Sequence, residues 1–159
     1  MKRLYIFDKD GTICQSKSGQ RFINSVRDQE LIPGVQKKIN QIKSTGAKIA
    51  IASNQDRVAF GFITYSEAGE IMDDAANLID ADYFVFCPAH SDGTVPGYRY
   101  DSENRKPEPG MIFNCMIHFD IKDLADVIFI GDRPEDKEAA KRAGVDFVWA
   151  DEFFENDQP

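Results

Sequence analysis

Arg-Leu-Tyr-Ile-Phe-Asp-Lys-Asp-Gly-Thr, residues 3–12, joins a short apolar run to two carboxylates that are separated by one residue. The run at 4–7 is β-branched and aromatic without a polar interruption, which is typical of a strand buried on both faces of a parallel sheet. In an extended backbone Asp8 and Asp10 point the same way with their Cα atoms about 7 Å apart, so their charges repel. A divalent cation would relieve this repulsion. The stretch therefore predicts a metal site at the end of a buried strand.

The composition is that of an ordinary globular protein with one hydrophobic core. The chain has 159 residues, of which 42% are hydrophobic and 29% charged, and its formal net charge is -8. This acidity disfavours broad, nonspecific binding of nucleic acid. No apolar run is long enough for a membrane helix, and the N-terminus does not read as a signal peptide. The three cysteines form no paired framework, so we expect a reducing compartment and a cytoplasmic protein.

Strand-like and helix-like segments alternate along the chain. Strands are expected at 4–7, 47–52, 83–86, 127–130 and 146–149, and helices at 35–46, 67–79, 111–119 and 134–143. This alternation predicts the α/β class, as a Rossmann-like three-layer sandwich with a mostly parallel central sheet. Residues 14–28 show no clear pattern, and the acidic stretch after Asp151 is expected to fray. We therefore predict one domain over 1–150 and a C-terminal tail over 151–159.

Polar clusters stand at the ends of three expected strands and at the head of one expected helix. They are Asp8/Asp10, Ser53/Asn54/Gln55, Asp132/Asp136 and Arg105/Lys106. Ligands of parallel sheets bind outside the carboxyl ends of the strands, so we expect all four clusters to converge there.

Carboxylates, a hydroxyl, amides and one lysine together suit phosphate chemistry. Mg²⁺ is held by one or two carboxylates plus a substrate phosphate, and a lysine is a point charge suited to a phosphoryl oxygen. A carboxylate can attack phosphorus, and a second one can protonate the leaving oxygen. Taken singly, Asp132 and Asp136 are also explained by helix capping, and residues 53–55 by turn chemistry.

Taken in order, these clusters resemble the motifs of the haloacid-dehalogenase superfamily of phosphohydrolases. Residues 8–12, Asp-Lys-Asp-Gly-Thr, match the first motif, and 53–55 are similar to the second. Lys106-Pro107 is similar to the third motif, and Gly131-Asp132 with Asp136 to the fourth. The gaps between the motifs are too short for a folded lid, so the resemblance implies the small branch without a large cap, similar to subfamily IIIA.

The resemblance implies a Mg²⁺-dependent phosphomonoesterase. Asp8 would be the nucleophile that becomes an aspartyl phosphate, and Asp10 the general acid and then the base for water. The implied metal ligands are the Asp8 carboxylate, the Asp10 backbone carbonyl, and Asp132 or Asp136. The implied phosphate-binding residues are Ser53, Asn54 and Lys106, and the implied substrate-binding residues are Gln55 and Arg105.

Two substrate classes follow from the resemblance. Residues 53–55 with the later Arg-Lys-Pro-Glu-Pro-Gly-Met are similar to sugar-bisphosphate and histidinol-phosphate phosphatases, whereas 18–22 and 28–33 resemble polynucleotide 3′-phosphatases. Net acidity favours a small phosphorylated metabolite, with a nucleic-acid 3′-end as the alternative. A module that accepts phosphate without turnover, or a phosphotransferase, stays a further alternative.

A structural zinc site is common in the sugar-bisphosphate group, in the loop before Arg-Lys-Pro. In this sequence Cys87 and His90 supply two ligands where a closed site needs four, so zinc is not expected.

Overall fold

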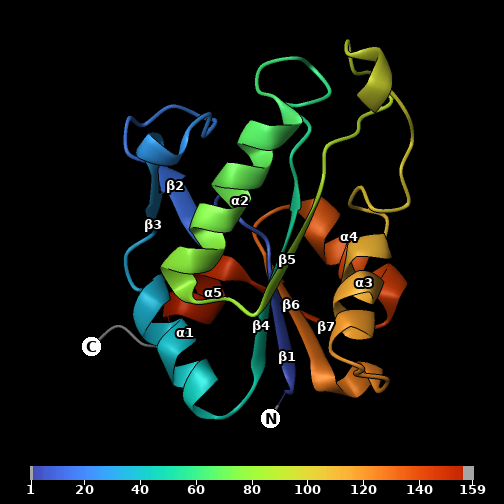
Figure 1. The fold of residues 1–159 in the computed structure, drawn as a ribbon. Coiled ribbons are helices and arrows are strands. Elements are labelled where there is room, and N and C mark those ends of the chain that lie inside the picture. Colours follow the sequence, from blue (N-terminus) through green and yellow to red (C-terminus); the bar gives the residue numbers. More distant parts are fainter. Residues whose placement is uncertain (1, 156–159) are drawn as a thin grey trace.

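The computed structural model describes residues 2–155 and contains a five-stranded parallel sheet between two layers of helices (Figure 1). The strands are β1 (Leu4–Phe7), β4 (Lys48–Asn54), β5 (Tyr83–Cys87), β6 (Val127–Gly131) and β7 (Asp146–Trp149). Their order is β5-β4-β1-β6-β7, and each neighbouring pair is parallel. The α/β sandwich predicted from the sequence is confirmed.

Each face of the sheet carries its own hydrophobic core. One face is covered by α1 (Val35–Ser44), α2 (Tyr65–Ile79) and α5 (Ala150–Glu155), and the other by α3 (Gly110–His118) and α4 (Pro134–Ala143). Central strand β1 contributes Tyr5 and Phe7 to the first core and Leu4 and Ile6 to the second. Burial on both faces is why this strand is uninterrupted by polar residues.

The short connecting elements complete the described fold. They are the 3₁₀ turns η1 (Val26–Asp28), η2 (Pro96–Tyr98) and η3 (Leu124–Asp126). In the part of the chain that the structure describes, no helix is long and apolar enough to cross a membrane.

A small hairpin occupies the stretch in which the sequence showed no pattern. Strand β2 (Cys14–Ser16) pairs antiparallel with β3 (Gln29–Leu31), with Cys14 opposite Leu31. Each strand has three residues, of which one is buried. Such a strand is too short for an alternating pattern to be recognised in the sequence. The hairpin lies beside α2 (Figure 1), and no large cap domain is present among the described residues.

The fraying predicted after Asp151 is wrong for residues 151–155, which belong to helix α5. Two aromatic residues within this acidic stretch anchor the helix. The rings of Phe153 and Phe154 pack on Phe7, with centroid distances of 5.8 and 6.1 Å. Residues 156–159 of the predicted tail lie outside the described residues.

Candidate active site

A cleft of about 430 Å³ lies at the carboxyl ends of the central strands. Strand β1 lies between β4 and β6, so the polar residues that follow these three strands become neighbours. The structure places all the site residues predicted from the sequence in the lining of this cleft: Asp8, Asp10, Ser53, Asn54, Gln55, Arg105, Lys106, Asp132 and Asp136. Their roles stay predictions.

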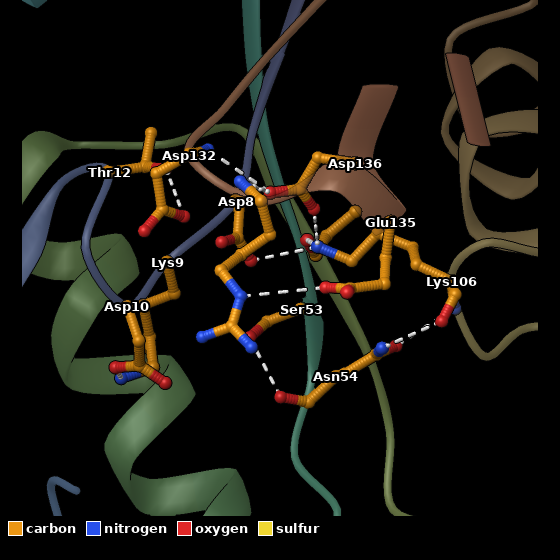
Figure 2. A network of polar contacts seen from close by, with 12 residues as sticks. Asp8, Lys9, Asp10, Thr12, Ser53, Asn54, Lys106, Asp132, Glu135 and Asp136 are labelled. Atoms are coloured by element: carbon orange, nitrogen blue, oxygen red, sulfur yellow. Dashed lines mark hydrogen bonds and ion pairs between the residues drawn. The ribbon is translucent and has the colours of Figure 1, made fainter. Parts of the chain in front are cut away.

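Three carboxylates meet at the floor of the cleft (Figure 2). Asp8, Asp132 and Asp136 each offer an oxygen, and these oxygens all lie within 4.8 Å of one another. The second oxygen of Asp136 accepts the backbone N–H groups of Asp132 and Arg133, at 3.1 Å each, which fixes its orientation at the start of α4. The hydroxyl of Thr12 donates to Asp132 at 3.2 Å. Residues from β1 and β6 thus converge on one point.

Two glycines leave room for this acidic cluster. Gly11 has a φ of +80°, and a Cβ built on it would stand 2.1 Å from Oδ2 of Asp132. A Cβ on Gly131 would stand 2.4 Å from the Cβ of Asp136. Any side chain at either position would displace a carboxylate of the cluster.

The ammonium group of Lys106 reaches between two of the carboxylates (Figure 2). Its Nζ donates to Asp8 at 2.8 Å, to Asp136 at 2.7 Å and to the carbonyl of Ala52 at 3.0 Å. Lys106 is 3% exposed, so these contacts replace its hydration. Burial by itself would lower the pKa of Lys106, but the carboxylates of Asp8 and Asp136 more than offset it and raise that pKa. Lys106 is therefore charged.

Even with Lys106 in place, the cluster carries an excess of negative charge. Burial raises the pKa of Asp8 well above its usual range, and the neighbouring Asp136 raises it further, although Lys106 opposes both effects. Burial and Asp136 raise the pKa of Asp132 as well. A set of close carboxylate oxygens with surplus negative charge fits a hard divalent cation such as Mg²⁺, which is bound by oxygen ligands.

Asn54 holds the backbone of Lys106. Its Nδ2 donates to the Lys106 carbonyl and its Oδ1 accepts the Lys106 N–H, both at 3.0 Å. This pair of hydrogen bonds joins the end of β4 to the loop before α3. No sequence pattern indicated this positioning contact, and the phosphate contact predicted for Asn54 stays a prediction.

Asp10 lies apart from the acidic cluster. Strand β1 ends at Phe7, so the expectation that Asp8 and Asp10 face one common point is wrong. Instead Asp10 accepts hydrogen bonds from Lys9 at 2.5 Å and from Gln55 at 3.2 Å, and its carboxylate points away from the cluster in Figure 2. The metal contact predicted through its backbone carbonyl is independent of where the carboxylate points.

Lys9 is a site residue that sequence reasoning missed. Its side chain is fully buried, and its Nζ donates to Gln29 of the hairpin at 2.8 Å as well as to Asp10. Gln29 in turn donates to Asp74 of α2 at 2.9 Å. A buried lysine beside the expected general acid thus links that acid to the hairpin. The available signal was a lysine placed between the two aspartates of the first motif.

The other residues of the cleft come from the end of β4, the start of α4 and several loops. Ser53 accepts a hydrogen bond from Gln55 at 2.8 Å, and Arg105 pairs with Asp56 at 2.9 Å. The loop between β2 and β3 adds Arg21, Phe22 and Ile23 to the lining, and the start of α4 adds Arg133 and Glu135. The loop residues were not identified as site residues because loops that contact substrate have no fixed pattern.

The two residues considered for zinc have other contacts. Cys87 is buried at the end of β5 and packs in the second core. His90 accepts the backbone N–H of Asp92 through Nδ1 at 3.0 Å, and its ring packs on Phe60.

The chain is similar to known phosphatases in sequence. Residues 3–157 match the profile of a family described as polynucleotide kinase 3 phosphatase. A curated relative, the D-glycero-β-D-manno-heptose-1,7-bisphosphate 7-phosphatase of Rhodopseudomonas palustris, is 33% identical over 143 residues, which cover 87% of this chain and 77% of the relative.

Two solved structures share the fold. The D,D-heptose 1,7-bisphosphate phosphatase of B. bronchiseptica, crystallised with magnesium and phosphate, is 28% identical with a TM-score of 0.75, over 92% of this chain and 79% of that one. A HAD-like protein of Mesorhizobium loti is 25% identical with a TM-score of 0.80, over 91% and 69%.

Proposed function

This chain belongs to the polynucleotide kinase 3 phosphatase family, within the haloacid-dehalogenase superfamily of phosphatases, and from that premise we propose a mechanism and a substrate class. The proposal is a Mg²⁺-dependent phosphomonoesterase that forms an aspartyl phosphate on Asp8. The observation that carries it is the buried ammonium of Lys106, held between Asp8 and Asp136 beside Asp132.

In the first half-reaction an oxygen of Asp8 attacks the phosphorus atom, and the bond from phosphorus to the leaving oxygen breaks. Lys106 holds Asp8 and offers positive charge to the phosphoryl oxygens, and Ser53 offers its hydroxyl. Because the phosphoryl-transfer transition state is loose, positioning and charge neutralisation supply most of the rate enhancement.

Asp10 transfers the protons. It protonates the leaving oxygen in the first step; in the second it takes a proton from water as the water attacks phosphorus and releases Asp8. Lys9 and Gln55 contact the Asp10 carboxylate in the structure. Because the carboxylate is about half exposed, it has room to move toward the leaving group.

The cation would be held by the carboxylates of Asp8 and Asp132 or Asp136 and by the backbone carbonyl of Asp10. When bound, Mg²⁺ neutralises charge on the phosphoryl oxygens. The three-carboxylate cluster supports this assignment, because its three carboxylates surround a single ammonium group, that of Lys106.

We propose a small sugar bisphosphate as the substrate, because the curated relatives are named for one. Histidinol phosphate is a second small candidate. The alternative is a nucleic-acid 3′-phosphate, which the matching family's description favours. The free, buried cysteines fit a reducing compartment, and we propose that the protein acts in the cytoplasm.

Steady-state kinetics test the proposal. Purified protein with Mg²⁺ is assayed for phosphate release from heptose 1,7-bisphosphate, histidinol phosphate and a 3′-phosphorylated oligonucleotide, alongside Asp8→Asn and Asp10→Asn. We expect Asp8→Asn to abolish turnover and Asp10→Asn to lower it strongly. Activity that survives in Asp8→Asn would overturn the aspartyl-phosphate mechanism.

Product analysis separates the remaining alternatives. A phosphate-accepting module would incorporate label at Asp8 without releasing phosphate, and Asp10→Asn would not change that. A phosphotransferase would deliver the label to an added acceptor alcohol in preference to water.

A further inference from the structure

Two arginines in the lining of the cleft have no carboxylate partner among the described residues. The other cations of the lining are paired: Lys106 with Asp8 and Asp136, Arg105 with Asp56 at 2.9 Å, and Arg133 with Glu135 at 3.5 Å. Among the described residues, neither Arg21 nor Arg57 forms an ion pair, although both line the cleft. Neither guanidinium is therefore held by a direct ion pair in the described chain, although the carboxylate of Asp56 lies near enough to act on the pKa of Arg57.

The guanidinium of Arg57 is held between two aromatic rings. Its Cζ lies 4.1 Å from the ring centroid of Phe22 and 4.0 Å from that of Phe62. Its Nε donates to Asn24 at 3.2 Å. A planar guanidinium stacked in this way keeps its terminal N–H groups at the edge, where they suit bidentate contact with an oxyanion.

The two rings are unusually exposed for phenylalanine. Phe22 is 40% and Phe62 64% accessible, and neither contributes to a hydrophobic core. They come from different loops, one between β2 and β3 and one after β4, so the stack joins these two loops beside the cleft. Arg21 lies 5.1 Å from the Phe22 ring and adds a second positive charge there.

We propose that Arg57, stacked between Phe22 and Phe62 and assisted by Arg21, forms a second anion subsite that binds a second phosphate group of the substrate. This inference rests on the proposed phosphatase function and specifies its substrate class. A phosphomonoester carries about two negative charges at neutral pH, which two guanidiniums match. The cleft of about 430 Å³ has room for a molecule that extends beyond the phosphoryl group at Asp8.

The test uses two matched pairs of substrates with Mg²⁺. Heptose 1,7-bisphosphate is compared with heptose 7-phosphate, and a 3′-phosphorylated dinucleotide with a 3′-mononucleotide. In each pair only the first member has a second phosphate. Wild type is compared with Arg57→Gln, with Phe62→Leu and with the control Arg99→Gln, which removes an exposed arginine outside the cleft.

We expect Arg57→Gln to lower kcat/KM for a substrate with two phosphates by about tenfold to a hundredfold, mainly through KM. Its effect on the one-phosphate partner should stay within about threefold, since the lost contact is absent there. Phe62→Leu keeps the charge but removes one face of the stack, so its loss should be smaller. If Arg57→Gln lowers kcat/KM selectively for heptose 1,7-bisphosphate, the substrate is a bisphosphate metabolite. If it lowers kcat/KM selectively for the 3′-phosphorylated dinucleotide, the substrate is a nucleic-acid end.

A binding measurement keeps the inference separate from turnover. Titration calorimetry with heptose 1,7-bisphosphate compares Asp8→Asn with the double variant Asp8→Asn/Arg57→Gln. Weaker binding of heptose 1,7-bisphosphate to the double variant supports the subsite even if the wild type hydrolyses no substrate. A lack of hydrolysis would contradict only the proposed function. Equal effects of Arg57→Gln on both members of each pair, or an equal effect of Arg99→Gln, would overturn the subsite while leaving the phosphatase intact.

Discussion

Removing the ammonium of Lys106 should destabilise the protein as well as inactivate it. In Lys106→Met the side chain keeps nearly the same length, one atom shorter, and loses three hydrogen bonds, to Asp8, Asp136 and the carbonyl of Ala52. Two carboxylates that are almost completely buried then face each other without a cation. Methionine fills the volume, so the expected effect is electrostatic and not the result of a cavity.

Removing one partner of a buried ion pair typically costs about 3–5 kcal/mol, because the other partner stays buried and charged. The cost should depend on pH. The pKa of Asp8 is already raised by burial, and it rises further without Lys106. Protonation of Asp8 then removes the repulsion, so we expect the loss of stability to shrink as the pH falls through the raised pKa.

Urea denaturation of wild type and Lys106→Met at several pH values, in EDTA, measures this loss. Lys122→Met is the control, because Lys122 pairs with Asp120 at 3.8 Å on the surface and should contribute less than about 1 kcal/mol. The variant Lys106→Met/Asp136→Asn removes one of the stranded charges and should recover part of the stability. The reasoning would be refuted if the loss of unfolding free energy in Lys106→Met did not change with pH, or if it equalled the loss in Lys122→Met.

Three further predictions use other parts of the structure. The folded-state pKa of Asp8 lies above its unfolded value, so the folded state binds more protons between the two values and its stability falls as the pH rises through that window. Adding Mg²⁺ in place of EDTA should therefore raise Tm more at neutral pH than at acidic pH. A rise in Tm that does not depend on pH would contradict this prediction. Gly11→Ala should lower kcat far more than Gly34→Ala, because both have positive φ but only the Gly11 methyl would collide with Asp132; equal kcat values would count against it. Burial raises the pKa of the Cys14 thiol to about 12, so native protein at pH 8 should react with a thiol reagent there only as fast as it unfolds, as a denaturant series would show.

The parallel sheet could be predicted because its strands are buried on both faces. Leu4, Ile6 and Phe7 have no exposed surface, and the uninterrupted apolar run is the direct result. The position of the cleft followed from topology, since the carboxyl ends of adjacent parallel strands share one edge. Helix α2 begins at Tyr65, two residues before the predicted start, because Thr64 and Glu67 form a capping box.

The missed features depend on pairings that local patterns do not encode. The β2–β3 hairpin needs its two strands to be together before either has a buried face. Lys9 is fully buried between two aspartates, and its contact with the distant Gln29 is one that no local pattern encodes. Asp8 and Asp10 were expected on one side because an extended strand was assumed to continue through them, whereas β1 ends at Phe7 and the chain turns at Gly11.

The charges of the cleft explain how a chain of net charge -8 can select an anionic substrate. Lys106 and the proposed cation would compensate the carboxylates on the floor, and Arg21 and Arg57 add two guanidiniums that have no ion-pair partner among the described residues, so a phosphate compound that fits within the cleft has cationic partners there. Phosphates that extend beyond the mouth meet an acidic protein. This arrangement favours a compact substrate with two phosphates over a long polyanion, because each further phosphate of a nucleic-acid strand would add repulsion and no new partner.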